Sequence, residues 1–276
     1  MSSFFDGTRP GTEIEMYGRK YELPVLYFRD DCFGLFFRAD LAKIRELLPS
    51  DKLHPLVFLG KKAVIAIVAF NYIDTTIGPY GEVGIVIPVV YGSDPPPRLR
   101  PILKESGFPG FGVLVTHLPV TNTLARDGGR GGWGYTKFVA DMDFTITPEF
   151  MECRMFEEQQ HILTMRVAKK GRIRKDSKPL VTYSVKDGNL LKTTIPQTGI
   201  QRMSLLPFGS FLNLGDHPVA LSIRELKLGS RPIMSRYYLE RSAILPEGEV
   251  IEEGVKPLDG YFGEDRDGEH EVKYLE

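Results

Sequence analysis

Residues 127–138 are the most unusual segment of this 276-residue sequence, and they read Asp-Gly-Gly-Arg-Gly-Gly-Trp-Gly-Tyr-Thr-Lys-Phe. Glycines let a backbone approach a ligand closely. Cations such as Arg130 and Lys137, set among aromatic side chains, are typical of pockets for small anionic ligands. The same composition is also typical of a flexible hairpin loop. On composition alone the segment is therefore either an anion pocket or a loop.

Three glycines of this segment, Gly129, Gly131 and Gly134, match the spacing of the dinucleotide-binding fingerprint. That fingerprint requires a strand before the glycines and a helix after them, so that the helix N-terminus faces the pyrophosphate. Residues 135–139 have the composition of a strand instead. A triphosphate-binding loop would need Gly-Lys followed by Ser or Thr, which the segment lacks. A nucleotide-binding oxidoreductase is thus supported by the glycine spacing alone.

The order of residues in the segment resembles the acetoacetate decarboxylase family, in which Gly-Arg and a short spacer precede Tyr-Pro-Lys-Lys. Here the pair Gly129-Arg130 precedes the run Tyr135-Thr136-Lys137-Phe138, with the same seven-residue step from arginine to lysine. The first lysine of the family's pair is the Schiff-base nucleophile. The resemblance therefore implies that Lys137 takes this role.

The segment departs from the family pattern at two positions, since Thr136 replaces the proline and Phe138 replaces the second lysine. In a second register, residues 134–137 would align with a Gly-Tyr-Pro-Lys sequence that follows the family's lysine pair, and the chain would lack the nucleophile. We use the first register because it keeps the Gly-Arg pair in place without a gap. An acidic residue that the family has upstream is also missing, because residues 65–70 are wholly apolar.

Two further segments resemble the family in the same order along the chain. Tyr80-Gly81-Glu82-Val83-Gly84, followed by Ile87-Pro88-Val89, is similar to the family's Tyr-x-Glu-x-Gly and Ile-Pro-Val. Phe36-Phe37-Arg38-Ala39-Asp40 is similar to its aromatic-Arg-x-Asp motif. The resemblance covers most of the chain, and it implies a homo-oligomeric enzyme that acts on a small keto acid.

A lysine with its usual pKa of about 10.4 is almost wholly protonated at neutral pH and cannot attack a carbonyl. Burial among apolar groups lowers the pKa of a lysine, and acetoacetate decarboxylase is itself an example of a lysine activated by its surroundings. We expect Trp133, Phe138 and residues 65–70 to desolvate Lys137. Because the adjacent second lysine is absent, burial must lower the pKa alone.

An iminium between Lys137 and a keto acid withdraws electrons from the β carbon, so that carbon dioxide can leave a β-keto acid without a metal or an organic cofactor. The expected function is therefore a lyase that decarboxylates acetoacetate or a related small β-keto acid. The same iminium also supports aldolase or dehydratase action on a larger keto acid. A non-catalytic small-molecule binding protein on the same fold is a further alternative.

Other residues are candidates for proton transfer and for substrate binding. Glu82 would handle protons or polarise the imine, unless it is a surface carboxylate of a turn. Arg130 offers a bidentate guanidinium to the substrate carboxylate, unless it is a solvated loop cation. Arg29 matches a family arginine after a shift of one position. The remaining candidates for substrate contact are the aromatic residues of the segment, Trp133, Tyr135 and Phe138.

The elements that must position these residues are predicted to be strands joined by turns. Residues 63–72 and 83–91 are apolar, β-branched runs that predict neighbouring strands. Residues 23–37 predict two strands, divided at Asp30-Asp31. Asp40 can cap a short helix that runs to about Leu48. Other strand-like segments are 112–115, 137–144, 161–167 and 180–185, and the prolines in 94–98 predict an extended stretch.

These elements predict a mainly β (α+β) fold, with a single mostly antiparallel, β-barrel-like domain and a few short helices. We assign residues 1–20 to an N-terminal arm or early hairpin and residues 21–276 to this domain. No linker marks another boundary.

Composition and charge limit the partners of the protein. Thirty-five basic and 36 acidic residues leave a net charge of -1, so no global field favours nucleic acid or an anionic membrane. The basic run 166–178 lacks interleaved aromatic residues and predicts a solvated hairpin. Cys32 and Cys153 are too few for a disulfide framework and have no metal-ligand spacing. Because the sequence shows neither a secretory signal nor a membrane span, a cytoplasmic location is expected.

Overall fold

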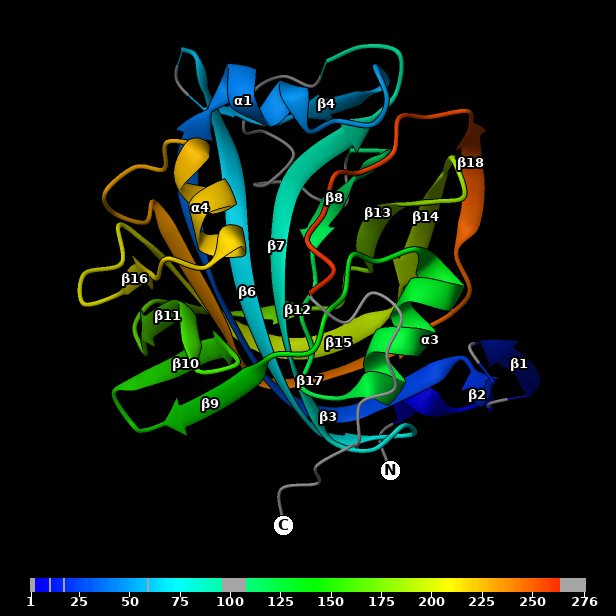
Figure 1. Cartoon of the computed structure of the whole chain (residues 1–276). Coiled ribbons are helices and arrows are strands. Elements are labelled where there is room, and N and C mark those ends of the chain that lie inside the picture. The colour runs from blue at the N-terminus through cyan, green and yellow to red at the C-terminus, as the bar shows by residue number, and fades with distance from the viewer. Residues whose placement is uncertain (1–2, 10, 17, 59, 96–107, 264–276) are drawn as a thin grey trace.

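A computed structural model of the chain describes residues 3–263 except 10, 17, 59 and 96–107. Most of the described residues lie in strands, and the helices are few and short (Figure 1). The mainly β prediction is therefore confirmed. Most of the predicted proline-rich extended stretch lies outside the described residues.

The largest sheet of the described residues has twelve strands. Neighbouring strands in it are antiparallel, except β8 and β13, which are parallel. The two ends of the strand order, β12 and β18, do not pair among the described residues, so the sheet is barrel-like without closing (Figure 1). The order is β12 (Arg172–Asp176), β15 (Gln197–Leu205), β17 (Met234–Leu245), β3 (Val25–Asp40), β6 (Lys62–Thr75), β7 (Tyr80–Tyr91), β8 (Phe111–His117), β13 (Leu180–Lys186), β14 (Asn189–Ile195) and β18 (Glu249–Glu253), with β4 (Leu53–Pro55) beside β7 and β5 (Val57–Phe58) beside β6.

The central strands of this sheet are buried on both faces, which explains their continuous apolar sequences. Ile65 and Ile67 of β6 belong to one buried cluster, whereas Val64 and Ala66 belong to another. The same alternation occurs in β7, where Ile85 and Val86 face opposite clusters. The sheet thus separates an outer core from an inner, concave side.

The outer core is covered by a second sheet and two short helices. This sheet has the order β16 (Phe211–Leu214), β11 (Gln160–Ala168), β10 (Phe150–Glu157) and β9 (Asp141–Ile146). The helices α1 (Leu41–Glu46) and α4 (Pro218–Glu225) contribute Ile44 and Ile223 to the same cluster. As predicted, the Asp40 carboxylate caps α1, and it accepts hydrogen bonds from the backbone N–H groups of Ala42 and Lys43. The helix ends two residues earlier than expected.

The prediction of two strands in residues 23–37 is wrong, because β3 runs unbroken through this region from Val25 to Asp40. The register shifts around Arg29, so the chain makes a β-bulge where a turn was expected. Asp30 stays in the strand because its carboxylate is buried and bound to Arg241 of β17, with Nη1 and Oδ2 2.6 Å apart.

The N-terminal residues form a short 3-10 turn, Ser3–Phe5, and a hairpin of β1 (Thr12–Met16) and β2 (Arg19–Leu23). The hairpin lies against the helix α3 (Thr123–Trp133), where the Tyr21 hydroxyl donates to the carbonyl of Leu124 at 3.0 Å. In the described part of the chain, no helix has the length and apolar character needed to cross a membrane.

The glycine-rich segment is a helix rather than a loop or hairpin. Asn122 caps its start by accepting a hydrogen bond from the Ala125 N–H at 2.8 Å. Gly134 ends it with a φ of 65°, in the left-handed conformation that favours glycine. The strand expected over 137–144 begins only at Asp141, and the residues just before it make a single bridge, between Val120 and Val139.

Candidate active site

Lys137 and Glu82 form a buried ion pair. Lys137 Nζ lies 2.6 Å from Glu82 Oε2, and the two residues are 4% and 7% exposed. Removing two charges from water is costly unless they meet in good geometry with further hydrogen bonds. The second carboxylate oxygen of Glu82 accepts a hydrogen bond from the Tyr72 hydroxyl at 3.1 Å. Both oxygens of Glu82 are therefore engaged.

Three backbone segments bring this pair together. Glu82 lies near the start of β7, where it bridges to Val120. The backbone of Leu118 and Val120 binds the segment that carries the lysine, through the carbonyls of Thr136 and Phe138 at 2.8 and 2.9 Å. Lys137 thus lies one segment away from β7, and its side chain spans that gap to reach Glu82.

Helix α3 leaves room for the lysine side chain at one glycine. A Cβ atom at Gly129 would collide with Cε and Cδ of Lys137. At Gly128 a Cβ would lie 2.6 Å from a ring carbon of Tyr21 on β2. Glycine disfavours helices by about 1 kcal/mol relative to alanine, so the composition correctly marked these positions as unusual. The glycines allow close packing of the helix on Lys137 and on the hairpin.

A cavity of about 470 Å³ lies on the concave side of the large sheet, and both Lys137 and Glu82 line it. Most of its other lining residues are aliphatic or aromatic, and many of these come from β3, β6, β7, β8 and β17. A cavity of this kind, with a few convergent polar groups, is a typical small-molecule site. In the described residues, no cluster of three or more His, Cys, Asp or Glu side chains suits a metal ion.

Three tyrosines beside the ion pair are held in their protonated form. Burial and the nearby charge of Glu82 raise the pKa of Tyr72 well above its usual range. Burial also raises the pKa of Tyr27 and of Tyr80, whose hydroxyls are 2.9 Å apart. Lys137 Nζ lies 5.9 Å from the centroid of the Tyr80 ring. These hydroxyls can therefore donate hydrogen bonds at neutral pH.

The structure brings four of the predicted site residues to the cavity: Lys137, Glu82, Trp133 and Tyr135. The Tyr135 hydroxyl is 2.7 Å from that of Thr182, and burial raises the pKa of Tyr135 to about 12. The Trp133 indole donates to the carbonyl of Pro246 at 2.9 Å. Both aromatic residues thus form part of the wall next to the ion pair.

The other three predicted residues do not line the cavity. Phe138 belongs to the outer core, where its ring contacts His217 and Tyr261. Lys137 lines the cavity while Phe138 is buried in the outer core, so the two neighbouring side chains lie on different sides. Arg29 is exposed at the bulge of β3.

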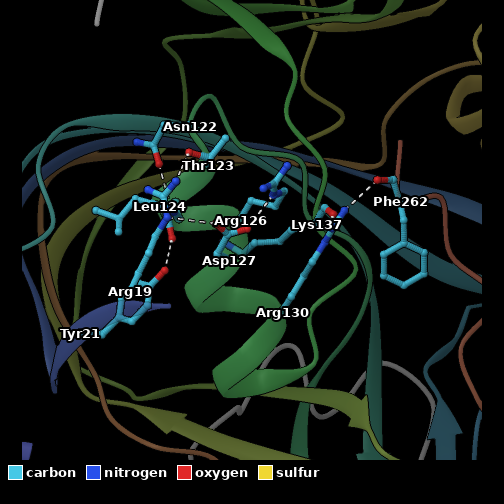
Figure 2. A network of polar contacts seen from close by, with 11 residues as sticks. Arg19, Tyr21, Asn122, Thr123, Leu124, Arg126, Asp127, Arg130, Lys137 and Phe262 are labelled. Carbon is cyan, nitrogen blue, oxygen red and sulfur yellow. Dashed lines mark hydrogen bonds and ion pairs between the residues drawn. The ribbon is translucent and has the colours of Figure 1, made fainter. Parts of the chain in front are cut away.

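Arg130 extends from α3 to the backbone beside the lysine (Figure 2). Its Nε donates to the carbonyl oxygen of Lys137 and its Nη2 to that of Phe262, both at 2.7 Å. The guanidinium therefore ties the C-terminal segment and the lysine backbone to the helix. On the other side of α3, Arg19 of β2 pairs with Asp127 at 3.4 Å (Figure 2).

A second arginine, Arg241 of β17, was not predicted from the sequence; it is 6% exposed and lines the cavity. Its Nη1 binds Asp30 at 2.6 Å, and its Nε donates to Gln197 Oε1 at 3.1 Å. Its guanidinium carbon lies 5.2 Å from the ring centroid of Phe70, which pairs directly with Glu82 across β6 and β7. The only signal in the sequence is a charged side chain within the strand-like run 234–245, a feature that Arg241 shares with Arg236 and Glu240.

The comparisons with known proteins agree with this fold. The family model for acetoacetate decarboxylase matches residues 14–206. The structure of acetoacetate decarboxylase from Legionella pneumophila subsp. pneumophila str. Philadelphia 1 is 17% identical, with a TM-score of 0.67 over 90% of this chain and 94% of that chain. No curated protein sequence matches the chain.

Two other solved structures are also similar. One, from structural studies of acetoacetate decarboxylase, is 18% identical, with a TM-score of 0.63 over 83% of this chain and 90% of that chain. The enduracididine biosynthesis enzyme MppR, complexed with the condensation product of pyruvate and imidazole 4-carboxaldehyde, is 11% identical, with a TM-score of 0.59 over 83% and 89%. These likenesses concern the fold. The family model, which matches most of the sequence, shows that this chain belongs to the acetoacetate decarboxylase family.

Proposed function

We propose that this protein is a carbon–carbon lyase that forms a Schiff base between Lys137 and a β-keto acid and releases carbon dioxide from it. The observation that carries the proposal is the buried contact between Lys137 and Glu82 at the wall of a largely apolar cavity. An amine on such a wall is shielded from bulk water and faces a space that a keto acid can enter. Family membership supports the same chemistry.

The reaction begins when the ammonium group of Lys137 gives up a proton to the carboxylate of Glu82, with which it is in direct contact. The neutral amine adds to the keto carbonyl, and loss of water leaves an iminium. The bond to the carboxylate then breaks, its electron pair moves toward the iminium to give an enamine, and carbon dioxide departs. Protonation of the enamine carbon and hydrolysis of the imine return the ketone and free Lys137. Tyr72 holds Glu82 in place throughout.

The substrate carboxylate requires a cation, and the sequence suggested Arg130 for this role. Arg241 is better placed because it lines the cavity, whereas Arg130 binds two backbone carbonyls. Asp30 and Gln197 fix the orientation of the Arg241 guanidinium and leave its Nη2 unused by either contact. An arginine fixed in this way can meet a carboxylate without losing much side-chain freedom.

Borohydride trapping tests the Schiff base. Incubation with acetoacetate, reduction and peptide mass mapping should give an adduct on Lys137, and a Lys137→Ala variant should give none. Lys192 lines the same cavity and provides a matched control, since Lys192→Ala should keep the adduct. An adduct on Lys192 instead, or full turnover by Lys137→Ala, would contradict the proposal.

Product analysis separates this proposal from its alternatives. Release of carbon dioxide in step with ketone formation supports decarboxylation. Condensation products without carbon dioxide would support aldolase or dehydratase chemistry, and adduct formation without turnover would support a binding protein. The family resemblance also implies a homo-oligomer, which sedimentation equilibrium tests.

A further inference from the structure

The cavity extends well beyond the Lys137–Glu82 pair. On β7 the alternate residues Glu82, Gly84, Val86 and Pro88 all line it. Alternate residues of a strand face the same side and rise by about 3.3 Å per residue, so this wall is roughly 20 Å long. Acetoacetate, a four-carbon acid, would occupy only one end of it. The volume of about 470 Å³ falls among cavities that hold drug-sized ligands.

The two ends of this wall differ in chemistry. At one end, Glu82 lies next to Phe70 and Tyr72 of β6, and Arg241 contacts Phe70. At the other end, four adjacent strands place apolar residues in direct register, and all of them line the cavity: Phe36 of β3, Ala66 of β6, Val86 of β7 and Val115 of β8. We call these four residues the apolar row. Their side chains offer no hydrogen bond to a substrate.

Two glycines lie between the polar end and the apolar row. Gly34 of β3 and Gly84 of β7 both line the cavity within long strands. Glycine weakens the interior of a strand, and it often marks a place where a ligand approaches the backbone closely. A Cβ at Gly84 would contact Leu118 and Val86 at 3.4 Å, and one at Gly34 would lie 3.0 Å from Val68. The two glycines therefore add no side chain to the wall between its polar end and the apolar row.

From the polar end, the apolar row and the glycines between them, we infer that the preferred substrate is a β-keto acid with an extended apolar substituent. Its keto acid group reacts at Lys137, and its substituent lies along the apolar row. This inference rests on the proposed function and specifies the substrate class of the same site. Half-buried cations that also line the cavity, Lys178, Lys192 and Arg236, suit an anionic acid and make a second carboxylate the competing possibility.

The test compares kcat/KM for straight-chain β-keto acids of four, six, eight and ten carbons, together with a β-keto dicarboxylic acid. Each methylene that becomes buried should raise kcat/KM by about fourfold, the equivalent of about 0.8 kcal/mol. A flat series, or a preference for the four-carbon acid, overturns the inference. A preference for the dicarboxylic acid also overturns it.

Substitutions along the wall locate the substituent. Val68→Phe and Val86→Phe narrow the cavity, and each should lower the ratio of kcat/KM for the eight-carbon acid to that for the four-carbon acid by at least about tenfold. Val250→Phe is the matched control, because Val250 is 50% exposed on β18 and should leave the ratio unchanged. An unchanged ratio in both wall variants overturns the inference.

Trapping with borohydride distinguishes failure of the proposed function from failure of the inference about the apolar substituent. If no acid of the series gives an adduct on Lys137, the proposed function fails. If all acids give the adduct at similar rates, the Schiff base stands and the inference about the substituent fails. Adduct formation with the four-carbon acid also verifies that each wall variant is folded.

Discussion

At the residue scale, the central feature is a pair of opposite charges buried together at a cavity. Replacing a buried ion pair by apolar residues is often neutral or stabilising, so Lys137 and Glu82 have no obvious advantage for stability. Their position suits proton transfer in a reaction, since each can exchange a proton with the other and both line the cavity. Tyr72 adds a hydrogen-bond donor that stays protonated.

Glu82→Gln should lower kcat/KM for decarboxylation by roughly 10²- to 10⁴-fold, because the amide keeps the shape but cannot accept the lysine proton. Steady-state kinetics measure this loss, and circular dichroism checks the fold. Glu152→Gln is the control, since Glu152 pairs with Arg166 away from the cavity. Near wild-type activity in Glu82→Gln would rule out proton transfer by Glu82.

Arg130→Met should slow adduct formation by roughly tenfold to a hundredfold, because the backbone of Lys137 loses its hydrogen bond to the guanidinium. The effect should be similar for acetoacetate and for acetone, which has no carboxylate. Borohydride trapping with both ligands measures it. If only acetoacetate is affected, Arg130 binds the carboxylate, as the sequence suggested.

His117 should make the stability of the protein depend on pH. Burial, with a smaller contribution from His217, lowers the pKa of His117 to about 4, and its Nδ1 has no hydrogen-bond partner among the described residues. The unfolded chain, with a histidine pKa near 6.5, therefore binds more protons between pH 6.5 and pH 4. The contribution of His117 to the free energy of unfolding is therefore complete above pH 6.5, and about 3 kcal/mol of it is lost as the pH falls toward 4.

Urea unfolding at several pH values tests this expectation against a His117→Leu variant. The variant should lack this part of the pH dependence, although other groups still titrate. Equal slopes of unfolding free energy against pH in the two proteins would show that His117 does not contribute.

At the element scale, α3 and the segment after it together position the backbone and the side chain of Lys137. The helix provides Gly129 for the lysine side chain and Arg130 for the lysine backbone. The segment 118–121 then fixes the following residues beside β7. The helix and the segment 118–121 together determine where the lysine backbone lies, and Gly129 of the helix leaves room for the lysine side chain.

Gly129→Ala should reduce activity strongly even though alanine favours helices by about 1 kcal/mol. The new methyl group collides with the Lys137 side chain and displaces it from Glu82. Gly128→Ala is a matched control, because its methyl group meets Tyr21 of the hairpin instead. Kinetics and thermal unfolding of both variants should show lost activity with Gly129→Ala and mainly lost stability with Gly128→Ala. Equal activity in the two variants would contradict the proposed role of Gly129.

At the scale of the whole molecule, the curved sheet joins distant parts of the chain around the cavity. The pair of Asp30 and Arg241 connects β3 with β17 over 211 residues, and Gln197 of β15 extends it. Burial raises the pKa of Asp30, and the positive charge and hydrogen bond of Arg241 partly offset this rise. Loss of the arginine would leave a buried carboxylate without its partner.

Arg241→Met should therefore destabilise the protein by about 3–5 kcal/mol, the range typical of a broken buried ion pair. The double variant Asp30→Asn/Arg241→Met should recover most of that stability, because no charge is left unpaired. Urea unfolding monitored by circular dichroism measures both. Additive losses in the double variant would show that the two residues stabilise the fold independently.

The sequence by itself determined several of the strands, the first helix and the choice of Lys137 as the candidate nucleophile. Strands such as β6 and β7 can be predicted from the sequence because both of their faces are apolar. The first helix can be predicted because Asp40 is a typical N-cap residue. Family motifs pointed to Lys137 and Glu82 without showing that they touch.

Only the tertiary structure decided what the glycines, Arg130 and Arg241 do. From the sequence the glycines suggest a loop, because local propensity disfavours glycine in a helix. They are needed in this helix for its close contacts with Tyr21 and Lys137, which the sequence does not reveal. Asp30 looks like part of a turn until its partner, 211 residues away, is in place. The Lys137–Glu82 site depends on such long-range packing, because burial and direction are properties of the folded chain rather than of any single segment.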